Sequence, residues 1–452
     1  MTLPQQLSLF EAEDPEESFK LSRANLGTFQ DSLRAPVHSW FTYPAGFSYK
    51  AVDEALRLYK VRPGMVVYDP FAGTATTNVV ASQRGIDSIG IEAHPFIYFV
   101  AQTKVFWEFD FSVLTTEINR LIARIRDTLK SQSLSSIEVE RIFPELVCKC
   151  YRREKLAALY LCREAIMSMP ASPFRNFAKL GLTSVLRSAA DVATGWPYIA
   201  PQKAKKNNSN GKSDVVSLFQ KRLHQMVSEL KQIYPTDFSP GKATIIYGDA
   251  RERQDRIEAD SIHLTFTSPP YLNNYDYADR TRLEMYFWGE ANTWGDITRE
   301  VRTRLMMSAT TQINRSDYDT ANLLSEDLVA AAPTVTGELR QKIRSLSELR
   351  LKKGGKKSYD IMVGGYFNDM ICVLQETFRV LAPGSAFVLI LGDSAPYGVY
   401  IPTHTYLGDI GLAIGFSDYS VEQLRTRGGK WKANPQRHKV ALQECILTLR
   451  KK

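Results

Sequence analysis

Two short apolar segments, residues 65–68 and 88–91, constrain the fold of this chain more than any other feature. Between them lie the loop Asp69-Pro70-Phe71-Ala72-Gly73-Thr74-Ala75-Thr76-Thr77 and a helical pattern that continues through Gln83. A strand, a loop, a helix and a second strand in this order form a βαβ unit with parallel strands. Since parallel sheets carry helices on both faces, the unit predicts an α/β fold with a doubly wound, Rossmann-like sheet.

The alternation of strands and helices resumes only after a long helical interval. Strand patterns at 243–247, 262–266 and 386–391 extend the sheet, and residues 444–449 close it in a hairpin-like end. The interval has helical periodicity at 115–130, 153–167, 174–188 and 216–233. We therefore expect one α/β domain made of residues 21–106 and 241–452, with residues 107–240 inserted as a helical subdomain.

Two local expectations follow from the same patterns. Residues 48–59 predict a helix that turns Val52, Leu56 and Leu58 inward. Pro383-Gly384 predicts a turn between a helix at 366–381 and the strand at 386–391.

Composition limits the class of protein. The net charge of +8 and the pI near 9.0 fit a polyanionic partner, although a merely basic enzyme has the same balance. Because no apolar run is long enough to span a bilayer and the N-terminus lacks a signal-peptide pattern, we expect a cytoplasmic protein without membrane contact. The five cysteines and six histidines do not have the spacing of a metal site. Residues 1–20 are polar and acidic, which predicts a disordered tail.

Acidic residues follow three of the predicted strands: Asp69, Glu92 and Asp249. A carboxylate at the end of the second strand accepts both hydroxyls of a ribose, and one at the end of the third is placed to recognise an adenine amine. The loop that starts at Asp69 brings small residues and free helix N–H groups to a ligand. Each acid alone also fits a solvated strand end or a helix cap. Three in succession favour a nucleoside-type cofactor.

The sequence DPFAGTATT resembles the signature with which DNA amino-methyltransferases bind S-adenosylmethionine. Residues 38–47 are similar to the segment that these enzymes fold over the methionine end of that cofactor. The resemblance implies a cofactor site made of Phe41, Asp69, Phe71, Gly73, Thr74, Glu92, Asp249 and Ala250. Ala75 departs from the pattern, because the family usually has a second glycine there; a methyl group at a position that needs positive φ strains the loop or crowds the cofactor.

The strand at 262–266 leads into Thr267-Ser268-Pro269-Pro270-Tyr271. An exocyclic base amine is a poor nucleophile because its lone pair is delocalised, so its methylation needs acceptors that hold the N–H groups. The Ser268 hydroxyl and the Pro269 carbonyl are two such acceptors, and Pro269 and Pro270 restrict the backbone that presents them. Tyr271 offers an aromatic face to a flipped-out base. A polyproline-like turn is the alternative meaning of this tetrapeptide, but the preceding strand favours catalysis.

The Ser-Pro-Pro-Tyr loop resembles the motif of cytosine-N4 methyltransferases, whereas adenine-N6 relatives more often have Asp at the position of Ser268. The resemblance spans residues 40–99 and 243–452, so residues 21–106 and 241–452 are expected to form the methyltransferase domain. It implies a site-specific methyltransferase that flips a cytosine out of double-stranded DNA. Adenine-N6 methylation is the first alternative; an RNA amino-methyltransferase and an inactive DNA-binding protein are two more.

Two basic segments are candidates for holding DNA by neutralising phosphates. One is the loop of the insertion with Lys203, Lys205, Lys206 and Lys212. The other spans residues 340–357 and includes Lys352, Lys353, Lys356 and Lys357. A solvated charged helix face explains either segment as well. We favour DNA for the second, because it follows the catalytic strand.

The acidic tail contains one apolar group, Gln6-Leu7-Ser8-Leu9-Phe10. It resembles the peptide with which bacterial replication and repair proteins dock on the DNA sliding clamp. Folding back onto its own domain and chance are the alternatives.

The resemblance to modification enzymes also implies a second partner, a restriction endonuclease that acts on the same DNA site.

Overall fold

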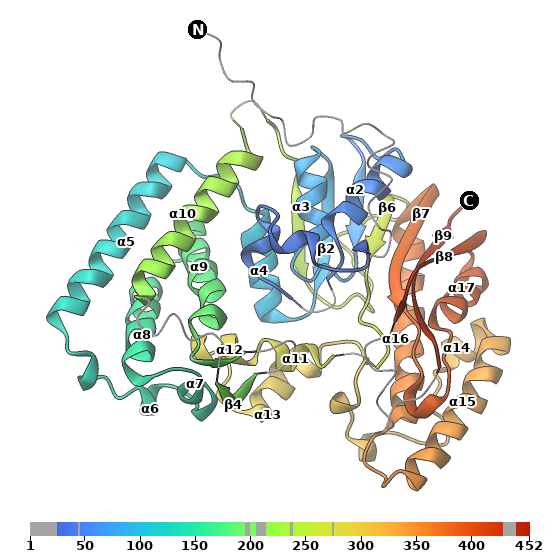
Figure 1. Cartoon of the computed structure of the whole chain (residues 1–452). Coiled ribbons are helices and arrows are strands. Elements are labelled where there is room, and N and C mark those ends of the chain that lie inside the picture. Colours follow the sequence, from blue (N-terminus) through green and yellow to red (C-terminus); the bar gives the residue numbers. More distant parts are fainter. Residues whose placement is uncertain are drawn as a thin grey trace.

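The computed structural model describes residues 25–43, 46–194, 199–204, 214–235, 238–273, 275–427 and 440–452. Within these residues a seven-stranded sheet of order β5-β2-β1-β6-β7-β9-β8 forms the centre of the molecule (Figure 1). Its strands are β1 (Val66–Asp69), β2 (Asp87–Glu92), β5 (Ala243–Tyr247), β6 (Ile262–Thr267), β7 (Leu381–Gly392), β8 (Asp418–Arg427) and β9 (Leu442–Arg450). A short antiparallel pair, β3 (Val192–Ala193) and β4 (Ala200–Ala204), lies apart from it.

The sheet confirms the predicted α/β fold. Strands β5, β2, β1, β6 and β7 are parallel, and β9 runs antiparallel between β7 and β8. The chain moves outward from β1 in both directions, to β2 on one side and to β6 on the other. In an open parallel sheet, ligands bind in the crevice that such a reversal leaves at the carboxyl ends of the strands.

Helices cover both faces of the sheet. On one face α2 (Tyr49–Leu58) and α3 (Thr76–Gln83) pack on the strands, and on the other α16 (Tyr359–Val380) and α17 (Thr403–Ile414) do so. Because successive strand residues point to opposite faces, Val388 and Ile390 of β7 join the first apolar cluster, whereas Phe387 and Leu389 join the second. The helix α4 (Pro95–Val105) packs beside β5.

The interval between β2 and β5 is mainly helical and also contains the short strands β3 and β4. Figure 1 shows its long helices standing together on the far side of α4 from the sheet. Their apolar cluster continues into residues of the sheet-bearing part, including Trp40, Phe96 and Phe287. The helices of the interval are α5 (Phe111–Ser131), α6 (Val139–Ile142), α7 (Glu145–Cys150), α8 (Arg153–Met167), α9 (Pro173–Ala189) and α10 (Val215–Ile233).

Further helices lie between β6 and β7. They are α11 (Tyr277–Arg280), α12 (Arg282–Trp288), α13 (Trp294–Ile297), the π-helical turn η5 (Thr298–Arg302), α14 (Glu326–Ala331) and α15 (Pro333–Lys352). The 3₁₀ turns are η2 (Asp31–Leu33), η3 (His38–Trp40), η4 (Leu134–Ser136), η6 (Thr310–Gln312), η7 (Arg315–Asp317) and η8 (Pro396–Gly398). Among the described helices, none is both long enough and apolar enough to cross a membrane.

Two local predictions are wrong. Leu58 is 69% exposed although Val52 and Leu56 are buried; it lies two positions after Leu56, and about 200° of rotation places it on the opposite side of α2. Pro383 and Gly384 do not form a turn outside the strand but lie within β7. Gly384 has φ +80° at the place where the pairing with β6 shifts register, so the two residues form an irregularity in one long strand.

Candidate functional site

A pocket lies at the carboxyl edge of the sheet, over the ends of β1, β2, β5 and β6. From the expected cofactor residues it is lined by Phe71, Gly73, Thr74, Glu92, Asp249 and Ala250. From the expected catalytic residues it is lined by Ser268 and Pro270. The structure therefore brings the two loops that the sequence singled out to the walls of one cavity.

Asp69 lies beneath the pocket rather than in its wall. Its Oδ1 accepts hydrogen bonds from the Thr267 hydroxyl at 2.6 Å and from the Phe71 backbone N–H at 3.0 Å. Burial raises the pKa of this carboxyl to about 6, against the hydrogen bonds that favour its charged form. Since Thr267 directly precedes Ser268, Asp69 ties the end of β1 to the start of the Ser268–Tyr271 loop.

Glu92 is the acidic group in the wall of the pocket beside the β1 loop. Its Oε1 accepts the backbone N–H of His94 at 2.7 Å. Burial raises the pKa of Glu92 to about 8, and the backbone N–H groups that it accepts only partly oppose that rise. A carboxylate held by the backbone at the end of β2 is suited to accept the paired hydroxyls of a ribose.

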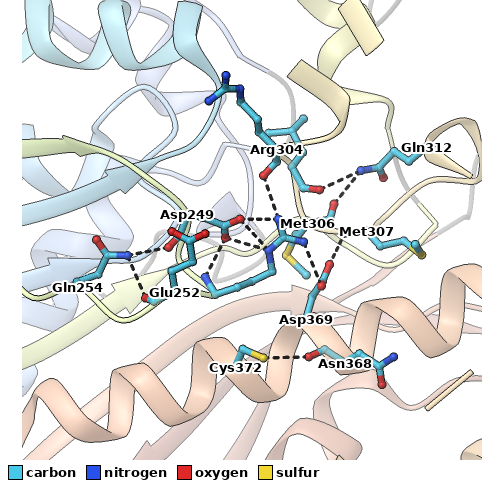
Figure 2. Close-up of polar contacts among 12 residues, drawn as sticks. Asp249, Glu252, Gln254, Arg304, Met306, Met307, Gln312, Asn368, Asp369 and Cys372 are labelled. Carbon is cyan, nitrogen blue, oxygen red and sulfur yellow. Dashed lines mark hydrogen bonds and ion pairs between the residues drawn. The ribbon is translucent and has the colours of Figure 1, made fainter. Parts of the chain in front are cut away.

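The third strand-end acid, Asp249, also lines the pocket but is engaged by a neighbour. Its Oδ1 accepts Nε of Arg251 at 2.9 Å, and its Oδ2 accepts Nη2 of the same side chain at 2.5 Å. Figure 2 shows Asp249 at the centre of a polar network that extends to Asp369 and to the backbone of Arg304. Asp249 is thus held in one orientation at the pocket wall.

The cofactor loop contains the backbone strain that its departure from the family pattern predicts. Ala75 has φ 63° and ψ 36°, the left-handed conformation that favours glycine, and it is fully buried. It lies at the N-cap of α3 and packs with Ala101 and Ile245. The loop is therefore strained, whereas the Ala75 methyl group does not line the pocket.

Substitutions at Ala75 should separate strain from packing. Ala75→Gly removes the left-handed cost of about 1–2 kcal/mol but also a buried methyl group worth about 0.8 kcal/mol, so the free energy of unfolding should change by less than about 1 kcal/mol. Ala75→Val puts a β-branched side chain at positive φ and should cost about 2 kcal/mol or more in denaturant unfolding. Ala101→Val overfills the same cluster on a regular helix; an equal loss in that variant would refute the role of φ.

The segment before α2 contributes to the pocket through Tyr43, Gly46 and Phe47. Tyr43 donates through its hydroxyl to the Tyr277 carbonyl at 3.3 Å. The ring of Phe41 instead packs on Phe96 at a centroid distance of 5.9 Å, outside the residues that line the pocket. Tyr43, Gly46 and Phe47 of this segment therefore reach the cavity, whereas Phe41 does not line it.

The Ser268–Tyr271 loop presents a hydroxyl to the cavity. The Ser268 Oγ is buried and makes no hydrogen bond of ordinary geometry to the described residues, although it lies near enough to the Tyr271 hydroxyl to lower the pKa of that group. Because Ser268 lines the pocket, this hydroxyl is available to a ligand there. Pro269 is buried behind it, and Pro270 completes the wall.

Tyr271 is anchored by the last two strands. Its hydroxyl donates to Oε1 of Glu444 at 3.1 Å, and the guanidinium of Arg427 lies 5.1 Å from its ring centroid. Burial and the Glu444 carboxylate raise the pKa of Tyr271 well above its ordinary value, while Ser268 and Arg427 act in the opposite sense. A base that stacks on the face covered by Arg427 has to displace that guanidinium.

Sequence reasoning missed part of the pocket wall. Arg304, Leu305 and Met306 line it from a stretch that has no motif and no periodic pattern. Tyr277 also lines it; for the aromatic and amide residues that follow Tyr271, the sequence left open whether they line the base pocket, contact the flanking strand or form a polar surface turn. The charge and composition of residues 304–306 carry no signal that would have found them, because only the tertiary fold brings them to the β5 end.

The four lysines expected to hold DNA are exposed. Lys352 ends α15, and Lys353, Lys356 and Lys357 follow before α16 begins at Tyr359. Since α16 runs back along the sheet to the start of β7, its first residue lies toward the carboxyl end of β7. The ring of Tyr359 packs on Tyr397, just beyond that end, at a centroid distance of 4.7 Å. The lysines therefore lie on the same side of the sheet edge as the pocket.

Other candidate segments lie outside the described residues. They are the expected clamp peptide Gln6-Leu7-Ser8-Leu9-Phe10, the insertion lysines Lys205, Lys206 and Lys212, and the side chain of Lys203.

Comparisons with known proteins give a consistent result. The family model for N6/N4 methyltransferases, described as DNA methylase, matches residues 11–103. The Type II methyltransferase M.BsoBI of Geobacillus stearothermophilus is 26% identical over 466 aligned residues, which cover 95% of this chain and 88% of the relative. M.AvaI of Anabaena variabilis is 25% identical, with 94% of this chain and 88% of the relative covered. M.MvaI of Kocuria varians is 20% identical, with 88% and 85% covered.

Proposed function

The chain belongs to the N4/N6 family of DNA methyltransferases, and we propose that it methylates the exocyclic N4 amine of cytosine at a specific site in double-stranded DNA. The observation that carries the proposal is the shared pocket. Ser268 and Pro270 line the same cavity as Gly73, Glu92 and Asp249. A methyl donor and an acceptor amine bound in this cavity would lie beside each other.

The pocket fits S-adenosylmethionine chemically. Glu92 is placed for the ribose hydroxyls, and Asp249 and Ala250 lie at the end of β5, where the adenine is expected. Gly73, with φ +52°, has only one atom of the described residues near the position of a Cβ, the Phe71 carbonyl at 3.9 Å, so the backbone leaves room for the methionine arm. When bound, S-adenosylmethionine supplies an electrophilic methyl group on a sulfonium.

The residues of the loop assist the amine rather than the donor. Ser268 Oγ and the Pro269 carbonyl accept the two N–H groups and draw the nitrogen lone pair out of conjugation with the ring. With S-adenosylmethionine bound, the nitrogen would form a bond to the methyl carbon as the carbon–sulfur bond breaks, and one amine proton would leave to solvent. Tyr271 holds the base by stacking after Arg427 moves from the ring.

Ser268 favours cytosine as the substrate. Adenine-N6 relatives more often have Asp at this position. This chain has Ser268 there, whose side chain is a neutral hydroxyl. Adenine N6 is the alternative target, because either amine needs the same pair of acceptors.

Double-stranded DNA is the proposed macromolecular partner. We assign phosphate contacts to Lys352, Lys353, Lys356 and Lys357, which are exposed on the side of the catalytic loop. Target recognition is assigned to the insertion at residues 107–240. We also propose a restriction endonuclease that acts on the same site as a partner. Docking of Gln6-Leu7-Ser8-Leu9-Phe10 on the sliding clamp remains a proposal that a pull-down with Leu9→Ala and Phe10→Ala controls would test.

Mass spectrometry of nucleosides tests the proposed reaction directly. DNA from a host with the gene should contain N4-methylcytosine that is absent without the gene. N6-methyladenine in its place would support the alternative target. Transfer of labelled methyl to RNA but not to DNA, or no transfer to any nucleic acid by the wild-type protein, would refute the proposal.

A further inference from the structure

Residues 302–309, which we name the bridge segment, connect the cofactor side of the pocket to the chain that follows the catalytic loop. The segment begins at the end of the π-helical turn η5 and passes through Leu305 and Met306, which line the pocket. Pi-helical turns occur often at functional sites. The segment itself has no motif in the sequence.

On the cofactor side, the bridge segment is held by two charged side chains. Arg251, which engages Asp249, donates to the Arg304 carbonyl at 3.2 Å and to Oδ1 of Asp369 at 3.1 Å. Asp369 in turn accepts the backbone N–H of Met307 through Oδ2 at 2.6 Å. Figure 2 shows Asp249 and Asp369 with the backbone of Arg304, Met306 and Met307 beside them. The ion pairs of Arg251 with Asp249 and Asp369 thus fix the backbone on both sides of Leu305 and Met306, which line the pocket.

On the catalytic side, the bridge segment makes two further contacts. Its Ser308 carbonyl accepts the backbone N–H of Asn273 at 2.9 Å, two residues after Tyr271. Its Arg302 donates through Nη2 to Oδ2 of Asp276 at 2.8 Å, and both side chains are buried. Asp276 caps α11 through the N–H of Ala278 at 3.1 Å. The backbone after the catalytic loop therefore depends on where the bridge segment lies.

Gln312, which follows the bridge segment, holds three backbone groups of that segment together. Its Nε2 donates to the Met306 carbonyl at 2.9 Å, and its Oε1 accepts the N–H groups of Ser308 and Ala309 at 2.8 and 2.9 Å. We therefore expect the backbone of Met306 and Ser308 to move together.

We propose that Arg251 and Asp369 are positioning residues: they hold the bridge segment against the bound cofactor and so set the backbone that follows Tyr271. This inference rests on the proposed function. Neither residue lines the pocket, so each acts through Asp249, Leu305 and Met306. Both carboxylates keep Arg251 charged, since burial disfavours its charge but Asp249 and Asp369 raise its pKa above the usual range.

The test uses the full chain and S-adenosylhomocysteine, with Asp369→Asn as the variant. Asparagine keeps an acceptor for the Met307 N–H but cannot pair with Arg251 as an ion. Asp360→Asn is the matched control, because Asp360 lies on the same helix α16, is 1% exposed and pairs with Arg315 at 2.8 Å away from the pocket. We expect Asp369→Asn to weaken cofactor binding about tenfold, and Asp360→Asn to change it by less than about twofold.

Hydrogen exchange supplies a readout that a purely structural role would not move. In the wild type, S-adenosylhomocysteine should slow exchange both at the Met307 amide and at the Asn273 amide, although Asn273 does not line the pocket. In Asp369→Asn, at saturating ligand, the slowing should persist at the β1 loop and be lost at Asn273. Equal protection of Asn273 in wild type and variant would overturn the inference. Failure of the wild type to bind S-adenosylhomocysteine would instead count against the proposed function.

Discussion

Replacement of Ser268 with alanine should slow methyl transfer about 10²-fold and leave the affinity for S-adenosylhomocysteine within about twofold of the wild type. The Ser268 hydroxyl is buried, lines the pocket and makes no hydrogen bond of ordinary geometry to the described residues, so a bound amine is the group that it would serve. An interaction made mainly in the transition state appears in the rate and not in ground-state binding. Single-turnover transfer of labelled methyl to DNA from a host lacking the gene measures the rate.

Thr265→Val is the matched control for this substitution. Thr265 lies three residues earlier on β6, is fully buried, and its hydroxyl also lacks a hydrogen-bond partner among the described residues. It does not line the pocket. Valine has nearly the same shape, so the variant should transfer methyl groups at the wild-type rate. A wild-type rate in Ser268→Ala would show that the hydroxyl does not assist the amine, and a parallel loss of cofactor binding would show that the substitution damages the pocket itself.

The sheet and most of its helices could be predicted because their signals are local. Apolar periodicity predicted α8 as Arg153–Met167 and β5 as Ala243–Tyr247, and the structure has these elements with the same bounds. The errors have local causes too: Leu58 is apolar but lies on the outer side of α2, and Gly384 is accommodated within a strand by an irregular pairing. Hydrophobic pattern alone does not decide either case.

The pocket residues also divide into those that local sequence signals predict and those that they do not. Gly73, Glu92 and Ser268 follow strands, and the carboxyl ends of parallel strands meet at one edge, so sequence order was enough to bring them together. Leu305 and Met306 reach the pocket through contacts of Arg251 and Asp369, which are far apart in the chain. Such long-range polar contacts have no periodic signal in one sequence. The position of Asp69 beneath the loop also depends on a side-chain contact with Thr267 that the sequence does not display.

Replacement of Glu92 with glutamine should weaken binding of S-adenosylmethionine about 10²-fold, or about 2.7 kcal/mol. A carboxylate that accepts hydrogen bonds from two hydroxyls contributes about 1.5–3 kcal/mol for each charged bond, and the amide offers only one neutral acceptor. The binding should also lose its pH dependence. In the empty wild-type pocket the pKa of Glu92 is about 8, and the ribose hydroxyls favour its ionised form. Wild-type affinity should therefore rise from pH 6 to about 8 and then level off, while the variant stays flat.

The same substitution should change the stability of the empty protein in the opposite direction. Between the ordinary pKa of 4.5 and the folded value of about 8, the native state keeps a proton that the unfolded chain has released. The wild type therefore loses stability as pH rises through this window, and Glu92→Gln should lose less. We expect the variant to melt at a higher temperature than the wild type at pH 8.5 but not at pH 5. Glu229→Gln is the control, since Glu229 is a buried carboxylate that accepts the Trp40 indole N–H away from the pocket. If Glu92→Gln bound S-adenosylmethionine with the affinity and the pH dependence of the wild type, Glu92 would be ruled out as the ribose acceptor. A carboxylate that binds the hydroxyls cannot be neutralised without changing both the affinity and its pH dependence.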